Sequence, residues 1–350
     1  MAARLRGGLG RGLLGLVISV AALTFVIRQV DLGRTAAILG SASLGWIAIM
    51  LTAQAVDLSL RAWRWQRLVA PIRFVRYVRM LEYLLIGYLA NNVLPARLGE
   101  LVRCHYLGDR EHLSRTTTLG TVVVERVVDT AVVVTIASLA ILVLHVRGLV
   151  ASAVLVGLAL TGLLVVALAF GLAAHRLPGA DRVIAWARKW PRVGAIALKL
   201  RHGLAVAGRP RTLLEAVVLS FWAWGATVVA FAAAGQALGI QMTWAQASLL
   251  AAGVALATAI PSGPSNLGTF DLAAVEIAST FGVPTAAAFA LALLAHASVL
   301  IMTSVGGAIA LLRLGWSKRG EARVAATESA ATESAGADVL PVDQVTPAEG

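Results

Sequence analysis

Long uncharged apolar runs are the feature of this sequence that most restricts its fold. Residues Gly12–Ile27, Ala36–Val56 and Leu149–Ala174 contain no charged side chain. A helix needs about 20 residues to cross the hydrocarbon core of a bilayer. Only a segment that satisfies its own backbone hydrogen bonds, as a helix does, crosses that core. We therefore expect an all-α polytopic membrane protein.

The composition supports this class and excludes others. Of the residues, 59% are hydrophobic and 14% are charged, and 30 Lys and Arg exceed 18 Asp and Glu by 12 positive charges. Positive residues gather in cytoplasmic loops and contact anionic headgroups, so we expect anionic inner-leaflet lipids as partners and no nucleic acid. The chain has one cysteine, Cys104, and lacks both a Walker-type loop and a Cys/His cluster. We accordingly expect no metal and no cofactor.

The stretch Asn91–Arg103 ends an apolar segment that is too short to be a comfortable span. Pro95 cannot donate a backbone hydrogen bond and disfavours helix just before it, so we expect a break there. Arg97, Glu100 and Arg103 recur three residues apart, which places them on one face of a resumed helix. A broken helix with ionisable residues at the break is how membrane proteins bind polar cargo.

A second stretch of this kind is Ile260–Asp271, which contains Pro261, Pro264, Asn266 and small residues. Two Gly/Pro-interrupted apolar segments in corresponding positions point to the binding site of a transporter. The alternative is that each segment is a kinked helix kept for packing, because proline kinks are tolerated in membrane helices.

Three charges lie within the expected span Thr116–Leu144: Glu125, Arg126 and Asp129. Each costs about 2.5–3.5 kcal/mol near the bilayer centre, so each needs a partner. Arg126 and Asp129 are three residues apart and pair along the helix, which leaves Glu125 to find a partner elsewhere. The charges either tie helices together or face cargo.

Upstream, Asp57 is followed by a cluster of arginines interleaved with Trp63 and Trp65. Tryptophan at headgroup depth and arginine near anionic lipid are typical of a cytoplasmic, interfacial segment. Asp57 and Arg61 are expected to form an ion pair at the end of a helix.

We expect about six full spans plus two re-entrant broken helices. The spans are Gly12–Ile27, Ala36–Val56, Thr116–Leu144, Leu149–Ala174, Leu213–Ala234 and Thr285–Leu312. The two broken segments then enter from opposite faces, so the two halves are inverted repeats. This arrangement leaves few positive residues outside and places both termini in the cytoplasm.

The expected domain organisation follows from these spans. A transmembrane domain covers residues 1–316, with halves at about 1–175 and 212–316. A basic amphipathic cytoplasmic segment, 180–211, joins the halves and lies on the inner leaflet. Residues 317–350 repeat Ala-Thr-Glu-Ser-Ala and are expected to be a disordered cytoplasmic tail.

Four stretches together resemble the flippase-like membrane domain of lysylphosphatidylglycerol synthetases in their order and spacing. They are Arg61–Trp65, Gly87–Arg103, Val124–Asp129 and Pro261–Phe270. The resemblance extends to about Trp316. The aminoacyl-transferase domain of the full synthetases is absent, so lysine transfer is not implied. Asp271 stands where that family more often has Glu.

The resemblance implies translocation of a polar-headed lipid, phospholipid or glycolipid in type, between leaflets of the cell (cytoplasmic) membrane. We expect Arg103 and Arg126 to bind phosphate, because guanidinium matches it bidentately, and Glu100 and Glu125 to hold these arginines. A homo-oligomer is left open. The expected substrate-binding residues are Asn92, Arg97, Glu100, Arg103, Glu125, Arg126, Asp129, Asn266 and Asp271.

Two other functions compete with this one. The first is an ion-coupled secondary transporter of a small soluble metabolite, for which His296 is the candidate proton relay. The second is a membrane-embedded transferase. We disfavour the transferase because no outer loop is long enough to build a substrate site, so we expect the chain not to be an enzyme.

Overall fold

The computed structural model describes residues 20–94, 98–146, 148, 152, 154–159, 161–163, 204–259 and 263–337. Within these residues the regular structure is helical and includes no strand, as expected of an all-α membrane protein. The first half contains α2 (Leu32–Gly40), α3 (Leu44–Val69), α4 (Tyr77–Val93), α5 (Gly99–Arg110) and α6 (Arg115–Leu144). The second half contains η3 (Ala205–Gly208), α10 (Pro210–Ala237), α11 (Trp244–Ala257), η4 (Pro264–Asn266), α12 (Thr269–Ser279) and α13 (Thr285–Ala337).

In the described part of the chain, three helical stretches are long and apolar enough to cross a membrane: α6, α10 and residues Thr285–Gly315 of α13. All three match expected spans. Of the span expected at Gly12–Ile27, residues 20–27 are described and belong to the apolar helix Val20–Gln29. Most of the span expected at Leu149–Ala174 and most of segment 180–211 lie outside the described residues.

The span expected at Ala36–Val56 is not one straight helix. α2 and α3 meet at an angle of 89°, so this part of the chain is either a broken span or a re-entrant loop. The helix breaks after Gly40 because Gly and Ser are poor helix formers and Ser favours turns. The backbone N–H of Ser41 turns back to the carbonyl of Ala37, which closes α2. α3 therefore starts at Leu44 and continues to Val69, well past the predicted end of the span.

Both predicted breaks are present. At the first break, Asn91 Oδ1 at the end of α4 accepts a hydrogen bond of 2.7 Å from the backbone N–H of Gly99. A Cβ atom on Gly99 would collide with the backbone oxygen of Gly87, so α4 and α5 pack this closely only with glycine there. Residues 95–97, which include Pro95 and Arg97, lie outside the described residues.

The second break runs from the end of α11 through η4 to α12. Ser265 and Asn266 both have left-handed backbone angles, with φ of 61° and 57°. Asp271 Oδ2 accepts a 3.0 Å hydrogen bond from the backbone N–H of Gly268, which caps the start of α12. Left-handed non-glycine residues are uncommon and gather at functional sites.

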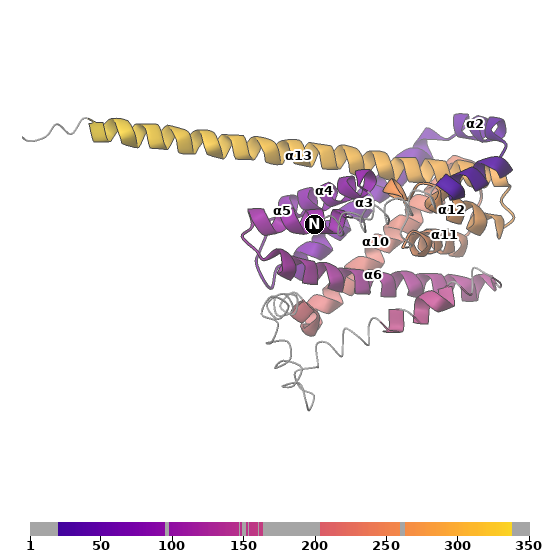
Figure 1. The fold of residues 1–350 in the computed structure, drawn as a ribbon. Coiled ribbons are helices and arrows are strands. Elements are labelled where there is room, and N and C mark those ends of the chain that lie inside the picture. Colours follow the sequence, from indigo (N-terminus) through magenta and orange to yellow (C-terminus); the bar gives the residue numbers. More distant parts are fainter. Residues whose placement is uncertain are drawn as a thin grey trace, which may run out of the picture.

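The two halves are arranged as inverted repeats. α3 and α10, which precede the two breaks, run antiparallel, since Ser43 N–H bonds Ala237 O at one end (2.8 Å) and Arg67 bonds Glu215 at the other (2.8 Å). α4 packs on α13 while α11 packs on α6, so exchanging the halves exchanges these two contacts. Figure 1 shows α13 and α6 on opposite sides of the bundle, with α10 running between them. The repeat predicted from charge distribution is thus present in the packing.

α13 is longer than expected, because it continues as helix through both Ala-Thr-Glu-Ser-Ala repeats to Ala337. Alanine has the highest helix propensity, and glutamate is also favourable, so these repeats extend the helix although they lack an apolar stripe. The expectation of disorder from residue 317 is therefore wrong as far as Ala337.

The inverted arrangement predicts the two ends of α10 to lie on opposite sides of the membrane. In a Cys104→Ala background, Gln241→Cys should react with an impermeant maleimide in intact cells, and Arg211→Cys only after permeabilisation. Both positions are exposed, so accessibility from water does not depend on unfolding. Labelling of Arg211→Cys in intact cells, with Gln241→Cys protected, would refute the predicted orientation.

Candidate functional site

Two arginines of α3, Arg61 and Arg64, are buried inside the protein and not at the interface that the sequence predicted. Arg64 is completely buried, Arg61 is 8% exposed, and Trp65 is completely buried, whereas Trp63 is 47% exposed. Asp57, Arg61 and Arg64 follow one another at helical spacing along one stripe of α3. This stripe faces α6, which supplies the carboxylates of Glu125 and Asp129, so Arg61 and Arg64 form ion pairs inside the protein.

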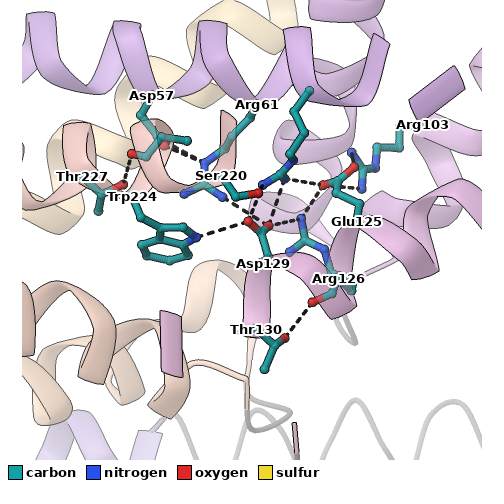
Figure 2. Close-up of polar contacts among 12 residues, drawn as sticks. Asp57, Arg61, Arg103, Glu125, Arg126, Asp129, Thr130, Ser220, Trp224 and Thr227 are labelled. Atoms are coloured by element: carbon teal, nitrogen blue, oxygen red, sulfur yellow. Dashed lines mark hydrogen bonds and ion pairs between the residues drawn. The ribbon is translucent and has the colours of Figure 1, made fainter. Parts of the chain in front are cut away.

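Arg64 is the centre of a buried ion network. Figure 2 labels its partners Glu125, Asp129 and Ser220. Its Nη1 donates to Asp129 and, at 2.8 Å, to the hydroxyl of Ser220 on α10. Its Nη2 donates to Glu125 Oε1 at 3.0 Å and to Asp129 Oδ2 at 3.0 Å. Trp224 Nε1 of α10 also donates to Asp129, at 3.2 Å. The network thereby joins α3, α6 and α10.

Glu125 has the distant partners that the sequence required, Arg64 of α3 and Arg103 of α5. Its Oε1 accepts from Arg103 of α5 at 3.2 Å and from Arg126 at 2.6 Å. Arg126 also lies 3.2 Å from Asp129, which confirms the expected pair along α6. The guanidinium of Arg103 stacks on the ring of Trp65, 4.5 Å from its centroid.

Arg61 and Asp57 complete the network. Arg61 Nε donates to both Asp57 oxygens at 2.8 and 2.9 Å, and its guanidinium lies 4.7 Å from the ring centroid of Trp224. The pair predicted at a helix end is therefore in the middle of α3. In total four guanidiniums face three carboxylates, so the network carries one net positive charge.

The two breaks meet each other and α13. Ser265 Oγ in η4 donates to the carbonyl of Asn92 at the end of α4, at 2.8 Å. Asn92 Nδ2 donates to Thr303 and Ser304 of α13 at 2.9 and 3.0 Å. Behind the second break, His296 of α13 contacts both Asp271 and the carbonyl of Ser265. Polar side chains thus replace the backbone bonds that each break removes.

A cavity of about 410 Å³ lies between the ion network and the two breaks, with walls from both halves of the chain. Arg103, Glu125 and Asp271 are buried behind its walls, at 3%, 1% and 1% exposure. Arg97 lies outside the described residues. The residues named from the sequence that line the cavity are Asn92, Glu100, Arg126, Asp129, Asn266 and His296.

Two of the predicted roles need revision. Arg103 is behind the wall and stacked on Trp65, so it supports Glu125 and does not face the cavity. Glu100 faces the cavity and, among the described residues, forms no ion pair. Glu125 pairs with both Arg103 and Arg126, and Asp129 also pairs with Arg126. Arg126, whose side chain is 46% exposed, remains the guanidinium best placed to meet a ligand.

The lining residues that were not predicted from the sequence include Asp57, Arg61, Tyr88 and Trp224. A signal was present for the first two, because their four-residue spacing continues to Arg64 in one helical stripe. The neighbouring Trp63 and Trp65 are typical of a headgroup boundary, so the stripe was interpreted as interfacial and not as buried. Trp224, in an otherwise uniform apolar span, offered no comparable signal.

Comparison with known proteins agrees with the architecture. A family model described as "Lysylphosphatidylglycerol synthase TM region" matches residues 12–307. The chain is 27% identical over 335 residues to a protein of Haloferax volcanii named glycosyltransferase AglD. The match covers 86% of this chain and 54% of the relative, so the chain spans about half the length of that relative.

This relative corrects one prediction. The expectation that the chain is not an enzyme is contradicted, because a relative that matches 86% of this chain is named a glycosyltransferase. The expectation was based on the lack of a long outer loop. That argument fails where charged and polar groups gather inside the helix bundle, as they do around the cavity here.

The network predicts that Arg64 is far more important for stability than an exposed arginine of the same helix. Arg64→Gln leaves buried Glu125 and Asp129 short of a partner and should lower the free energy of unfolding by about 3–5 kcal/mol. Arg67→Gln removes the exposed pair with Glu215 and should cost at most about 1 kcal/mol. Unfolding of the purified protein in mixed detergent measures both; equal losses would contradict the central role of Arg64.

Proposed function

Because the chain belongs to the lysylphosphatidylglycerol synthase TM region family, we propose that it moves a polar-headed lipid between the leaflets of the cytoplasmic membrane. The observation that carries the proposal is the cavity between the two breaks. It places the half-exposed guanidinium of Arg126 beside uncharged polar groups, Asn92 and Asn266 among them, within an apolar helix bundle.

Such a cavity addresses the main barrier to lipid movement. A headgroup loses its water on entering hydrocarbon, and an unpaired charge there costs several kcal/mol. A guanidinium matches a phosphate bidentately, and the carboxylates of Asp57 and Glu100 suit an amine or sugar hydroxyl. The volume of about 410 Å³ lies within the range of small-ligand sites, so it suits a headgroup with the acyl chains left in lipid.

The inverted repeat supplies the route between faces. Two halves that run antiparallel offer a central site two related conformations, each open to one side. The cavity is lined by both halves, so a relative movement of the halves changes its access. We place both termini and segment 180–211 in the cytoplasm, with that segment on anionic inner-leaflet lipid. The basic character of the segment supports this placement.

Glycosyl transfer is a second candidate, favoured by the similarity to glycosyltransferase AglD. In this case the cavity holds a lipid that donates or accepts a sugar. Glu100 is the carboxylate to test, since it faces the cavity without an ion pair among the described residues. Transfer of labelled sugar from a nucleotide sugar into membrane lipid, by membranes with and without the chain, separates this candidate from lipid movement alone.

Arg126→Gln should slow lipid movement at least about tenfold, because it removes a charge-assisted contact to the headgroup. The full chain is reconstituted into phosphatidylethanolamine–phosphatidylglycerol vesicles with fluorescent phosphatidylglycerol, and a quencher added outside reports the outer leaflet. Arg115→Gln, in the exposed first turn of the same helix, is the matched control and should move lipid like the wild type. Equal rates for all three proteins would refute the proposed role of the cavity.

Glu100→Gln should accumulate normally, since it breaks no ion pair within the described residues, yet alter lipid movement because it removes a charge from the cavity wall. Membrane abundance and quenching rate are measured on the same preparations. Wild-type abundance together with a wild-type rate would show that Glu100 takes no part in binding.

A further inference from the structure

His296 makes two contacts that a neutral imidazole cannot satisfy together. Its Nδ1 lies 3.1 Å from Asp271 Oδ1, and its Nε2 lies 2.9 Å from the backbone carbonyl of Ser265. A carbonyl and an ionised carboxylate only accept hydrogen bonds, and neutral imidazole carries a single N–H. Neutral His296 beside ionised Asp271 therefore leaves one contact with two acceptors facing each other.

One additional proton on the pair resolves this conflict. Either both ring nitrogens carry hydrogen beside ionised Asp271, or Asp271 is protonated and donates to Nδ1 while Nε2 donates to Ser265. The two forms hold the same number of protons and differ only in which residue carries the shared proton. Both have zero net charge, which suits a site that is 5% exposed or less within a membrane domain. The protonated pair therefore satisfies both contacts of His296.

The contacts of His296 connect this proton to the break. Ser265, whose carbonyl accepts from Nε2, has a left-handed φ of 61° and also donates its hydroxyl to Asn92 in the first break. Phe270 stacks on the imidazole with ring centroids 4.2 Å apart, which favours a charged ring. Loss of the proton removes one hydrogen bond from this chain of contacts and leaves a net negative charge beside it.

The remaining charges of the cavity lie on other elements. Asp271 of α12 is the charged group that contacts His296 in the described part of the chain. From across the cavity α3 presents Asp57 and Arg61, α5 presents Glu100, and α6 presents Arg126 and Asp129, while the lining residues of α4, α10, α11 and η4 are uncharged. Apart from Glu100, these groups are ion-paired. The His296–Asp271 pair differs from Glu100 because it contacts η4 directly, through the carbonyl of Ser265.

We propose that the His296–Asp271 pair binds the proton that couples the pH difference across the membrane to lipid movement. This inference deepens the proposed function and rests on it. Water in the cavity supplies the proton and takes it back, because His296 lines the cavity. The protonated pair holds η4 against α13 and the first break, and the deprotonated pair releases it. The loss of one buried hydrogen bond changes such an equilibrium by about tenfold.

Two variants separate protonation from simple loss of structure. Asp271→Asn keeps an oxygen to accept from Gly268 and gives neutral Nδ1 a donor, so every contact is made without the extra proton. Asp271→Asn should fold normally and keep η4 packed against α13 and the first break at every pH. His296→Gln loses one of the two contacts, with Asp271 or with the carbonyl of Ser265, and should leave η4 released from α13 and the first break at every pH. His105→Gln removes the exposed pair with Asp109 and is the matched control.

The first measurement does not depend on transport. ¹⁵N-histidine NMR of the full chain in lipid nanodiscs, between about pH 5 and 9, reports the protonation of each ring, and His296→Gln assigns its signal. Hydrogen exchange at Ser265 and Asn266 follows the break over the same range. We expect proton loss from the pair and about tenfold faster exchange to share one midpoint, which Asp271→Asn abolishes and His105→Gln leaves unchanged. The inference is overturned if the protonation of the pair stays constant over this pH range, or if hydrogen exchange at Ser265 and Asn266 does not change with that protonation.

The second measurement applies a pH difference across the vesicles described above. Wild type and His105→Gln should respond with about a tenfold change in lipid movement, and Asp271→Asn and His296→Gln should not. Lipid movement indifferent to the pH difference in the wild type overturns the coupling while the proposed function stands. Absence of lipid movement at every pH, with proton-linked opening intact, refutes the proposed function and leaves the proton-binding pair supported.

Discussion

The ion pairs of Arg64 with Glu125 and Asp129 are the interactions on which the rest of the structure depends. A charge within a membrane span is costly unless it is paired, and three of the four arginines of the network are almost fully buried. Pairing Arg64 with α6 and with Ser220 brings α3, α6 and α10 to one point. The antiparallel contact of α3 and α10, and with it the inverted repeat, is built around this point.

The network also explains why a polar cavity persists among apolar helices. Its carboxylates are already occupied by arginines, while Arg126 remains half exposed and directs the surplus positive charge toward the cavity. The breaks complete the opposite wall through Asn92 and Ser265. In the proposed function, the ion pairs on one side of the cavity bind the lipid headgroup. The His296–Asp271 pair on the other side controls, by gaining and losing a proton, when the lipid moves.

Much of this arrangement could be predicted from the sequence. Pro95 and the Pro261–Pro264 stretch located both breaks, because proline removes a helical hydrogen bond whatever surrounds it. The isolated charge of Glu125 required a distant partner. The asymmetry of positive residues predicted the inverted repeat before any packing was known. The similarity to a known family added the class of cargo, which no physical argument from composition supplied.

Other parts could not be predicted, because they depend on tertiary contacts. The sequence does not distinguish an interfacial from a buried location for Arg61 and Arg64, because their partners on α6 are distant in the chain. Trp63 and Trp65 favoured the interfacial location, which is wrong. The bend between α2 and α3 interrupts a run that hydropathy alone counts as one span. The extension of α13 to Ala337 follows from local propensity, which the absence of an apolar stripe concealed. The exclusion of enzyme chemistry failed because loop length was used where the interior of the bundle mattered.

The central claim, that a lipid headgroup occupies the cavity between the two breaks, is tested most directly by photo-crosslinking. A phospholipid with a diazirine in its headgroup is incorporated into vesicles with the full chain, illuminated, and the adducts are located by mass spectrometry. We predict adducts on cavity residues from both halves, with Thr130 and Thr227 as accessible examples, and their loss when unlabelled phospholipid is added in excess. Adducts confined to the outer, lipid-facing surfaces of the helices would contradict the claim.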